Sequence, residues 1–415
     1  MGKIFSDAVE QALVYVFYNE RAQRGREGFA MLEQASAAGD GDTSCALARC
    51  LSGGQYIWAG HQFPCDDDRA EQLIRLSVEQ GSAVGALVSM RMGLMTPSLE
   101  KKMPFASLEE AFSIVLEKAE LGDAFCQYAI GNVYFWWDFI RIFGKGRDSF
   151  PSEGAFQSYV RENVVKCEDW FQKAFRGGMW LAGNNLRNYY LKGDSDVGLP
   201  PRPELAADIW RQGAEYGYPV HQRFYADDLR EAKDYESALK WYKTAAEGGE
   251  LAAYYYVGHA YEEGEGVAKD ETEAARWYRA RLDRGMQVGC CNALGALYFK
   301  GKGVEQDYAK AFQLINWAYT EGKNDWGVYY LGVMYVHGWG VQQDYAKARE
   351  ILEKVTWNNH QVHYCLGVIY GNALGGAAED IPRAVEHLQK AASVPEAKEE
   401  LLKYRKTLFG KWVRR

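Results

Sequence analysis

A short glycine motif recurs at a fixed spacing in the second half of this chain and limits what the chain can fold into. Gly-x-Gly-Val-x-x-Asp occurs at 264–270, 301–307 and 338–344. A period of this length is typical of arrays of small supersecondary units, because one such unit cannot bury its apolar face alone and must stack on its neighbours. The motif therefore predicts a stack of repeats between Asp234 and Ala392.

Helical patterns fill the intervals between the motifs. One helix of each unit begins near an alanine whose copies stand 36 or 37 residues apart, at Ala238, Ala274, Ala311, Ala348 and Ala384. The other helix carries a glycine followed three residues later by a tyrosine, with the glycine at Gly258, Gly295, Gly332 and Gly367. Glycine inside a helix costs about 1 kcal/mol relative to alanine, so its recurrence at one register predicts a helix crossing too close for a side chain.

These residues closely resemble the Sel-one-like repeats, which are longer relatives of the tetratricopeptide repeats. Four copies are strong, and weaker copies of the alanine pattern extend upstream as far as Gly28. The resemblance implies an all-α fold, a right-handed superhelical solenoid of stacked helix pairs. It also implies a scaffold or adaptor role, since members of this family bind other proteins through the concave surface.

The pattern divides the chain into four parts. Residues 1–122 carry degenerate helical repeats, and residues 123–203 carry repeats interrupted by an aromatic and basic insertion at about 136–164. Regular repeats occupy 204–393. Residues 394–415 follow the last repeat, and their leucines predict a capping helix over Glu396–Leu408 that covers the exposed end of the stack.

The first helix of each pair lines the inner groove in the tetratricopeptide arrangement that this chain resembles. Counting six and three residues before the glycine, and one and four after it, gives the candidate lining. Its aromatic and amide side chains suit an extended peptide or a protein edge. The predicted protein-binding groove comprises Phe125, Tyr128, Asn132, Asn184, Asn188, Tyr255, His259, Asn292, Phe299, Tyr329, Val333 and Tyr364. Several of the tyrosines have an alternative role in packing between neighbouring repeats.

The insertion combines aromatic rings with basic side chains, which are enriched at interface hot spots. Two interpretations stay open, a local minicore folded back on the solenoid and a contact loop for a partner. The contact interpretation rests on Trp136, Trp137, Phe139, Arg141 and Phe143.

Composition excludes several classes of function. The net charge of −8 and the pI near 5.6 argue against a nucleic-acid binder. No run of residues is apolar enough to span a bilayer, and the first residues do not resemble a secretory signal, so we expect a cytoplasmic protein without membrane insertion. The eight cysteines lack regular spacing, which favours buried free thiols, as at Cys167 and Cys290, over disulfides.

No motif predicts an enzyme, a metal or a cofactor. The paired glycines lack the third glycine and the Lys-Ser/Thr pair of a phosphate-binding loop. His61 with Cys65, and His360 with His363, are two-ligand starts without a further pair.

The sequence thus predicts a scaffold or adaptor that binds a protein or peptide in its groove, including the case of a neutralising, immunity-type partner. The alternatives are a glycan or cell-wall ligand in the aromatic groove and a hydrolase. The partner's identity and the oligomeric state stay open.

Overall fold

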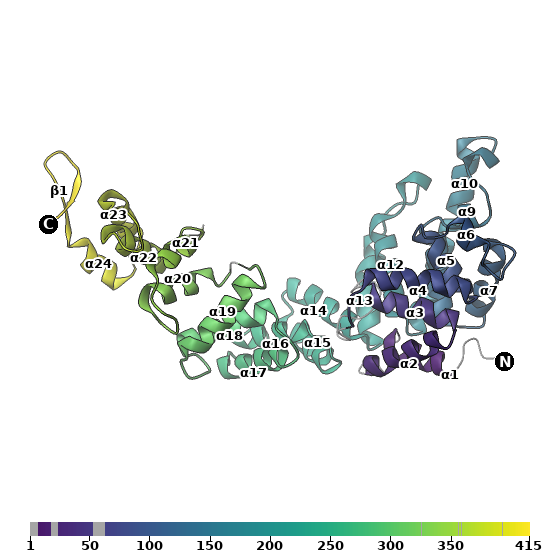
Figure 1. Cartoon of the computed structure of the whole chain (residues 1–415), viewed down its shortest axis with the longest axis horizontal. Helices are drawn as coiled ribbons and strands as arrows, with labels where there is room; N and C mark the ends of the chain where they lie inside the picture. The colour runs from purple at the N-terminus through teal and green to yellow at the C-terminus, as the bar shows by residue number, and fades with distance from the viewer. Residues whose placement is uncertain are drawn as a thin grey trace. The chain divides into compact units, whose positions relative to one another are not determined.

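The computed structural model describes residues 7–17, 24–52, 63–324, 326–355, 357, 359–391 and 393–415. Its contacts divide the chain into two compact units, Met1–Ala253 and Tyr254–Arg415, which we term unit 1 and unit 2. The division falls within the regular repeats of 204–393. Each unit is built from helices that follow one another as pairs (Figure 1).

Unit 1 contains the helices α1 (Asp7–Val16), α2 (Gly25–Ala37), α3 (Gly41–Leu51), α4 (Asp67–Glu79), α5 (Ala83–Arg91), α6 (Pro97–Glu100), α7 (Leu108–Glu120), α8 (Ala124–Phe135), α9 (Phe139–Ile142), α10 (Glu153–Val164), α11 (Lys166–Arg176), α12 (Trp180–Lys192), α13 (Pro203–Glu215), α14 (Pro219–Glu231) and α15 (Tyr235–Glu247). Two single turns of 3-10 helix, η4 (Arg147–Ser149) and η5 (Ser195–Val197), lie between them.

Helix α16 (Ala253–Glu263) begins at the last residue of unit 1. Unit 2 continues with α17 (Glu271–Leu282), α18 (Val288–Lys300), α19 (Tyr308–Thr320), α20 (Val328–His337), α21 (Tyr345–Leu352), α22 (His360–Gly371), α23 (Ile381–Lys390) and α24 (Pro395–Leu401). The strands β1 (Tyr404–Lys406) and β2 (Trp412–Arg414) pair antiparallel after α24. The predicted all-α solenoid of stacked helix pairs is confirmed.

The repeated glycine motif joins the two helices of a pair as the sequence predicts. Gly301 and Gly338 end α18 and α20 in the left-handed conformation, with φ of 64° and 70°. That conformation is unfavourable for residues with a Cβ atom, which explains the recurrent glycine. The aspartate that closes each motif then caps the next helix, since Asp307 accepts a hydrogen bond from the backbone amide of Lys310 at 2.9 Å.

The helix crossings explain the second recurrent glycine. A Cβ atom added to Gly295 on α18 would lie 2.5 Å from Cγ1 of Ile315 on α19, closer than real contacts allow. The alanine that begins the second helix is buried as well, with Ala311 fully covered. The same close approach occurs between Gly131 and Phe171, Gly258 and Tyr278, Gly332 and Leu352, and Gly367 and Leu388.

The insertion is helical and folds against unit 1. Helix α8 pairs with α11, so α9, η4 and α10 form an excursion between the two partners of one pair. Phe139 is 0% exposed, and the ring of Phe143 packs on Phe112 with centroids 5.3 Å apart. The insertion therefore has the minicore that one of the two interpretations predicts.

The end of the chain differs from the prediction. The helix expected over Glu396–Leu408 stops at Leu401 and is followed by the β1–β2 hairpin, so that prediction was wrong for its second half. The hairpin turns between Thr407 and Lys411, where the amide of Thr407 donates to the main-chain oxygen of Lys411 at 2.7 Å and Gly410 has a φ of 80°. Tyr404 of β1 is buried with Val385 and Leu388 of α23, which covers the apolar face of the last pair.

Two further expectations concern the cysteines and membrane-spanning helices. All eight cysteines are free, and all except Cys65 are buried, as predicted for Cys167 and Cys290. Burial raises the pKa of the Cys45 thiol to about 12, so this thiol stays protonated at neutral pH. None of the described helices is both long and apolar enough to cross a bilayer.

We predict that Gly295→Leu destabilises the protein by about 1–3 kcal/mol, because the new side chain overpacks the crossing of α18 with α19. Urea unfolding followed by circular dichroism would measure the loss. The matched control is Gly154→Leu, since a Cβ at this helical glycine meets only Oγ of Ser152, at 4.0 Å. Equal unfolding midpoints for the two variants would contradict the role of the crossing.

Candidate functional site

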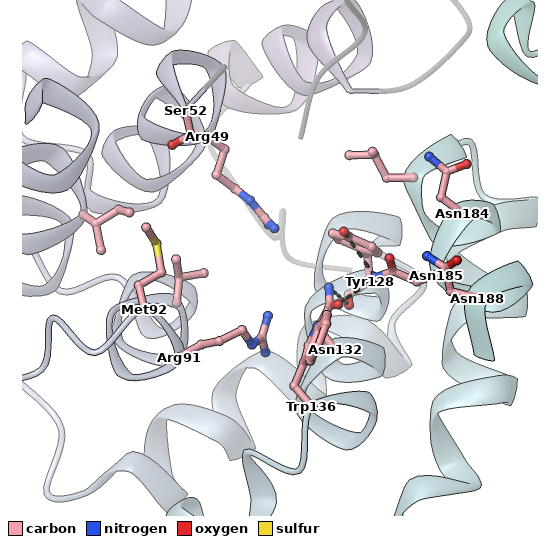
Figure 2. Close-up of a pocket in the computed structure, with 13 residues that line it drawn as sticks. Arg49, Ser52, Arg91, Met92, Tyr128, Asn132, Trp136, Asn184, Asn185 and Asn188 are labelled. Atoms are coloured by element: carbon pink, nitrogen blue, oxygen red, sulfur yellow. Dashed lines mark hydrogen bonds between the residues drawn. The ribbon is translucent and has the colours of Figure 1, made fainter. Parts of the chain in front are cut away.

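Unit 1 contains a cavity of about 510 Å³, which we term the unit 1 cavity. Side chains of α3, α4, α5, α8 and α12 line it, together with Trp136, which follows α8. Figure 2 shows Arg49 and Arg91 extending from one side toward Tyr128 and Asn132 on the other. The volume lies within the range of about 300–1,000 Å³ that is usual for ligand sites.

Four polar lining residues occupy one shared position in their helices. Each stands nine residues after the N-cap, so the register of the repeat directs each of them to the same side. The caps and lining residues are, in chain order, Asp40 and Arg49, Ser82 and Arg91, Asp123 and Asn132, and Met179 and Asn188. We term the four lining residues the polar ladder. It presents two guanidinium groups followed by two amides.

Arg49 is the most buried charged group of the ladder. Its side chain is 5% exposed, and its Cζ atom lies 5.4 Å from the ring centroids of both Phe125 and Tyr128. Arginine suits such a place better than lysine does, because its planar guanidinium is less strongly hydrated and stacks on aromatic faces. The two rings therefore support the charge at the cavity wall.

Arg91 is held at the opposite end of the same wall by a carboxylate from the insertion turn. Its Nε donates a hydrogen bond to Oδ2 of Asp138 at 2.6 Å, and Nη2 lies 2.6 Å from the same oxygen. Burial raises the pKa of Asp138, and the charge of Arg91 acts in the opposite direction. The ion pair is partly buried, so it fixes the orientation of Arg91 more firmly than a surface pair would.

An amide network forms the facing wall. Nδ2 of Asn185 donates to Oδ1 of Asn132 at 2.8 Å, and Nδ2 of Asn132 donates to the main-chain oxygen of Tyr128 at 2.9 Å. Figure 2 shows these side chains beside Asn184 and Asn188 from α12. The network connects α8 to α12 and places several amide groups at the cavity.

The first turn of the insertion brings Trp136 to the cavity through a strained backbone. Trp137 has a φ of 62°, which costs a bulky residue about 1–3 kcal/mol, and strained residues of this kind cluster at functional sites. Its indole Nε1 donates to Oδ2 of Asp194 at 3.2 Å, which holds the turn in place. The consequence is that Trp136 remains 59% exposed while it lines the cavity, and that Asp138 reaches Arg91.

A buried histidine supports one of the lining amides. His221 on α14 is fully buried among aromatic rings, and its Nε2 lies 3.3 Å from Oδ1 of Asn184. Because Oδ1 only accepts, we assign the proton of the neutral ring to Nε2. Burial lowers the pKa of His221 to about 3, so the ring is neutral near pH 7.

Unit 2 has a second cavity, of about 670 Å³, which we term the unit 2 cavity. Its wall is aromatic, with Trp339 stacked on both Tyr308 and His337 at centroid distances of 4.9 Å and 4.4 Å. Val333 and several lysine, glutamine and glutamate side chains complete the lining. Burial lowers the pKa of His337, which keeps this ring uncharged near pH 7.

The two cavities collect most of the predicted groove residues. Tyr128, Asn132, Asn184 and Asn188 line the unit 1 cavity, and Phe299, Tyr329, Val333 and Tyr364 line the unit 2 cavity. The register rule did not identify Arg49, Arg91 or Asn185.

The remaining groove residues line neither cavity. Phe125 is buried beneath Arg49, and Asn292 is buried with its Nδ2 donating to Oδ1 of Asn324 at 2.9 Å. Tyr255 packs on Tyr278, with ring centroids 6.0 Å apart. His259 lies beside Tyr255, and its Nδ1 is 3.7 Å from Oε2 of Glu265. For Tyr255 the structure has the packing role that was the alternative to partner binding.

The predicted contact residues of the insertion separate into two groups. Phe139 is fully buried and cannot meet a partner, so its assignment to a contact surface was wrong. Trp137 and Phe143 are half-buried, while Trp136 and Arg141 are exposed. The surface that the insertion contributes to the unit 1 cavity is that of Trp136 alone.

The histidine and cysteine pairs do not form larger clusters in the described part of the chain. His61 lies outside the described residues. His363 lies with its Nδ1 3.0 Å from Nδ1 of His387, rather than pairing with His360, whose Nδ1 contacts the main-chain oxygen of Lys390. Among the described residues, no group of three or more histidine, cysteine, aspartate or glutamate side chains is arranged to hold a metal ion.

A family model for the Sel1 repeat matches six segments, at residues 153–179, 224–250, 251–280, 288–320, 327–354 and 362–393. The chain contains six Sel1 repeats. The resemblance drawn from the sequence is confirmed, and the first match begins inside the predicted insertion, at the start of α10. Sel1-repeat proteins are generally scaffolds for protein interactions and typically carry no enzymatic activity.

Three solved structures are similar to this chain. A Sel1 repeat protein from Oxalobacter formigenes is 23% identical with a TM-score of 0.45, covering 80% of this chain and 90% of its own. A protective antigen of uropathogenic Escherichia coli with an SLR fold is 21% identical with a TM-score of 0.43, and 90% of each chain is covered. A Sel1 repeat protein from Klebsiella pneumoniae subsp. pneumoniae is 20% identical with a TM-score of 0.32, covering 47% of this chain and 96% of its own. No curated protein matches the chain.

The burial of His221 predicts a loss of stability in acid. The unfolded chain binds a proton at this ring below pH 6.5, whereas the folded chain keeps the ring neutral down to about pH 3. The unfolded state is therefore favoured as the pH falls through this window. Between about pH 7 and pH 5 we expect the wild type to lose about 2 kcal/mol more than His221→Phe does, measured by urea unfolding. Equal losses in the two proteins would contradict this assignment.

Proposed function

We propose that this protein is a scaffold that binds a partner protein by holding an extended segment of it in the unit 1 cavity. The observation that carries the proposal is the polar ladder. The first helices of four successive pairs, α3, α5, α8 and α12, each place a hydrogen-bonding side chain at one shared position along one cavity. A stack of repeats that presents equivalent side chains at regular intervals matches the regular spacing of a peptide main chain.

The chemistry of the lining supports a peptide as the occupant. Asparagine amides both donate and accept, so Asn185, which Asn132 holds in place, and Asn188 are suited to the N–H and C=O groups of a main chain. Trp136 adds a broad apolar surface with one donor, a combination that is enriched at the centres of protein interfaces. The strained turn that presents Trp136 is a further reason to assign the binding site to this cavity.

The aromatic unit 2 cavity favours a second candidate function, the binding of a glycan. Sugars bind proteins by stacking on open aromatic faces, and Trp339 and Tyr330 belong to this lining. The stacking of both Tyr308 and His337 on Trp339, however, occupies much of the indole surface. We therefore rank this candidate second. Retention of the protein on cell-wall polysaccharide, abolished by Trp339→Ala, would favour it over the peptide scaffold.

We predict that Trp136→Ala weakens binding of the partner about ten-fold or more, because the variant removes an aromatic contact at the cavity. The partner is first recovered by affinity purification from the source cells, and its affinity for each variant is then measured by calorimetry.

The matched control for this measurement is Trp326→Ala. Trp326 is 57% exposed, nearly the same as Trp136, but it lines neither of the two cavities. Equal affinities for the two variants would contradict the assignment of the site to unit 1.

A further inference from the structure

The unit 1 cavity has an unusual charge for this protein. The whole chain carries a net charge of −8, yet the described residues of the cavity lining include two arginines and neither aspartate nor glutamate. The two arginines are neighbours in the polar ladder, on α3 and α5, which pack against each other. A cavity of this kind attracts an anion, whereas the net negative charge of the whole chain repels one.

The setting of Arg49 orients its guanidinium toward the cavity. The rings of Phe125 and Tyr128 support the group near its Cζ atom, and Figure 2 shows its nitrogen end directed into the cavity. A guanidinium bound in this way directs its N–H groups outward as a rigid fork. The geometry matches two oxygen atoms held in one plane, as in a carboxylate.

Arg91 has donor capacity beyond its ion pair. Both contacts of Arg91 converge on one oxygen of Asp138, through Nε and Nη2. Among the described residues, Nη1 of Arg91 makes no hydrogen bond. Asp138 thus orients the guanidinium without using all of it, and the remaining N–H groups are available to a ligand in the cavity.

We propose that the peptide segment held in the unit 1 cavity presents a carboxylate to Arg49 and Arg91, with its main chain along the amides of α8 and α12. This inference rests on the proposed function and names the chemical group that the site selects. The carboxylate belongs either to an aspartate or glutamate side chain or to the C-terminus of the partner, since both offer the same two coplanar oxygens.

The same geometry disfavours a phosphate group. Asp138 lies against Arg91 and repels a dianion more strongly than a monoanion. Among the described lining residues, the other polar groups are neutral amides, hydroxyls and an indole rather than further cations. Two arginines with one neighbouring carboxylate therefore match a single negative charge.

Selection from displayed random dodecapeptides tests the proposal on the full-length protein. One library displays peptides with a blocked C-terminus and a second displays them with a free C-terminus. We expect binders that are lost on Trp136→Ala and that share an acidic residue or a free carboxyl end. Enrichment of acidic residues in the blocked library assigns the carboxylate to a side chain, and binders from the free-end library alone assign it to the C-terminus.

Two other outcomes of the selection separate this inference from the proposed function. Binders that depend on Trp136 but need no carboxylate would overturn the inference and leave peptide binding in place. The absence of any binder that depends on Trp136 would overturn the proposed function and the inference with it.

A double-mutant cycle on one selected peptide then assigns the contact. Replacing its carboxylate by the amide, Glu to Gln or a C-terminal amide, should weaken binding to the wild type about ten-fold or more. The same replacement should change the affinity less than about three-fold in Arg49→Gln. The control variant Arg69→Gln removes an exposed arginine of α4 that pairs with Glu33, and it should keep the full ten-fold effect.

The peptide replacement in the wild-type protein keeps the test valid if Arg49→Gln does not fold. If this replacement weakens binding to the wild-type protein less than about three-fold, that result alone overturns the proposal. A phosphoserine in place of the acidic residue should also weaken binding, and tighter binding of the phosphopeptide would contradict the selection of a monoanion.

Discussion

In the four repeats from α16 to α23, a glycine of the first helix lies directly against a large side chain of the second helix, and this contact sets the register of the pair. The contact leaves no space for a Cβ atom, so the two helices can pair in one relative position only. Successive residues of a helix are turned by about 100° from one another. When Gly131 faces Phe171 on α11, the next residue, Asn132, is turned toward the cavity. Packing thus determines which side chains reach the ligand site.

The same register lowers the folding stability of unit 1, because it places residues at the cavity that suit binding better than folding. A guanidinium buried as deeply as that of Arg49 is expensive to desolvate and contributes little to folding. The positive φ of Trp137 is a second local cost, offset by the ion pair of Asp138 and the hydrogen bond to Asp194. Both costs fall on the walls of one cavity. Unfavourable features gathered at one place indicate a binding site more strongly than any single side chain does.

The periodic part of the molecule could be predicted from the sequence because its cause is local. The glycine turns, the capping aspartates and the crossing glycines each follow from the backbone conformation that their residue allows. The register rule then located Tyr128, Asn132, Asn184 and Asn188. It was not extended upstream to α3 and α5, where Ala48 and Met90 stand at the place of the counting glycine, and so it did not locate Arg49 and Arg91. Counting from the N-caps, Asp40 and Ser82, would have found both.

Two features of the structure leave no periodic signal in the sequence. The place of Trp136 depends on the turn at Trp137, and the β1–β2 hairpin depends on the packing of Tyr404.

Photo-crosslinking with the recovered partner tests most directly whether the unit 1 cavity is the docking site. Benzoylphenylalanine is placed at Met92, which lines the cavity, or at Met286, which is equally exposed in unit 2 and lines neither of the two cavities. We expect light to link the partner to the protein from position 92 and not from position 286. A crosslink from position 286 with none from position 92 would contradict this expectation.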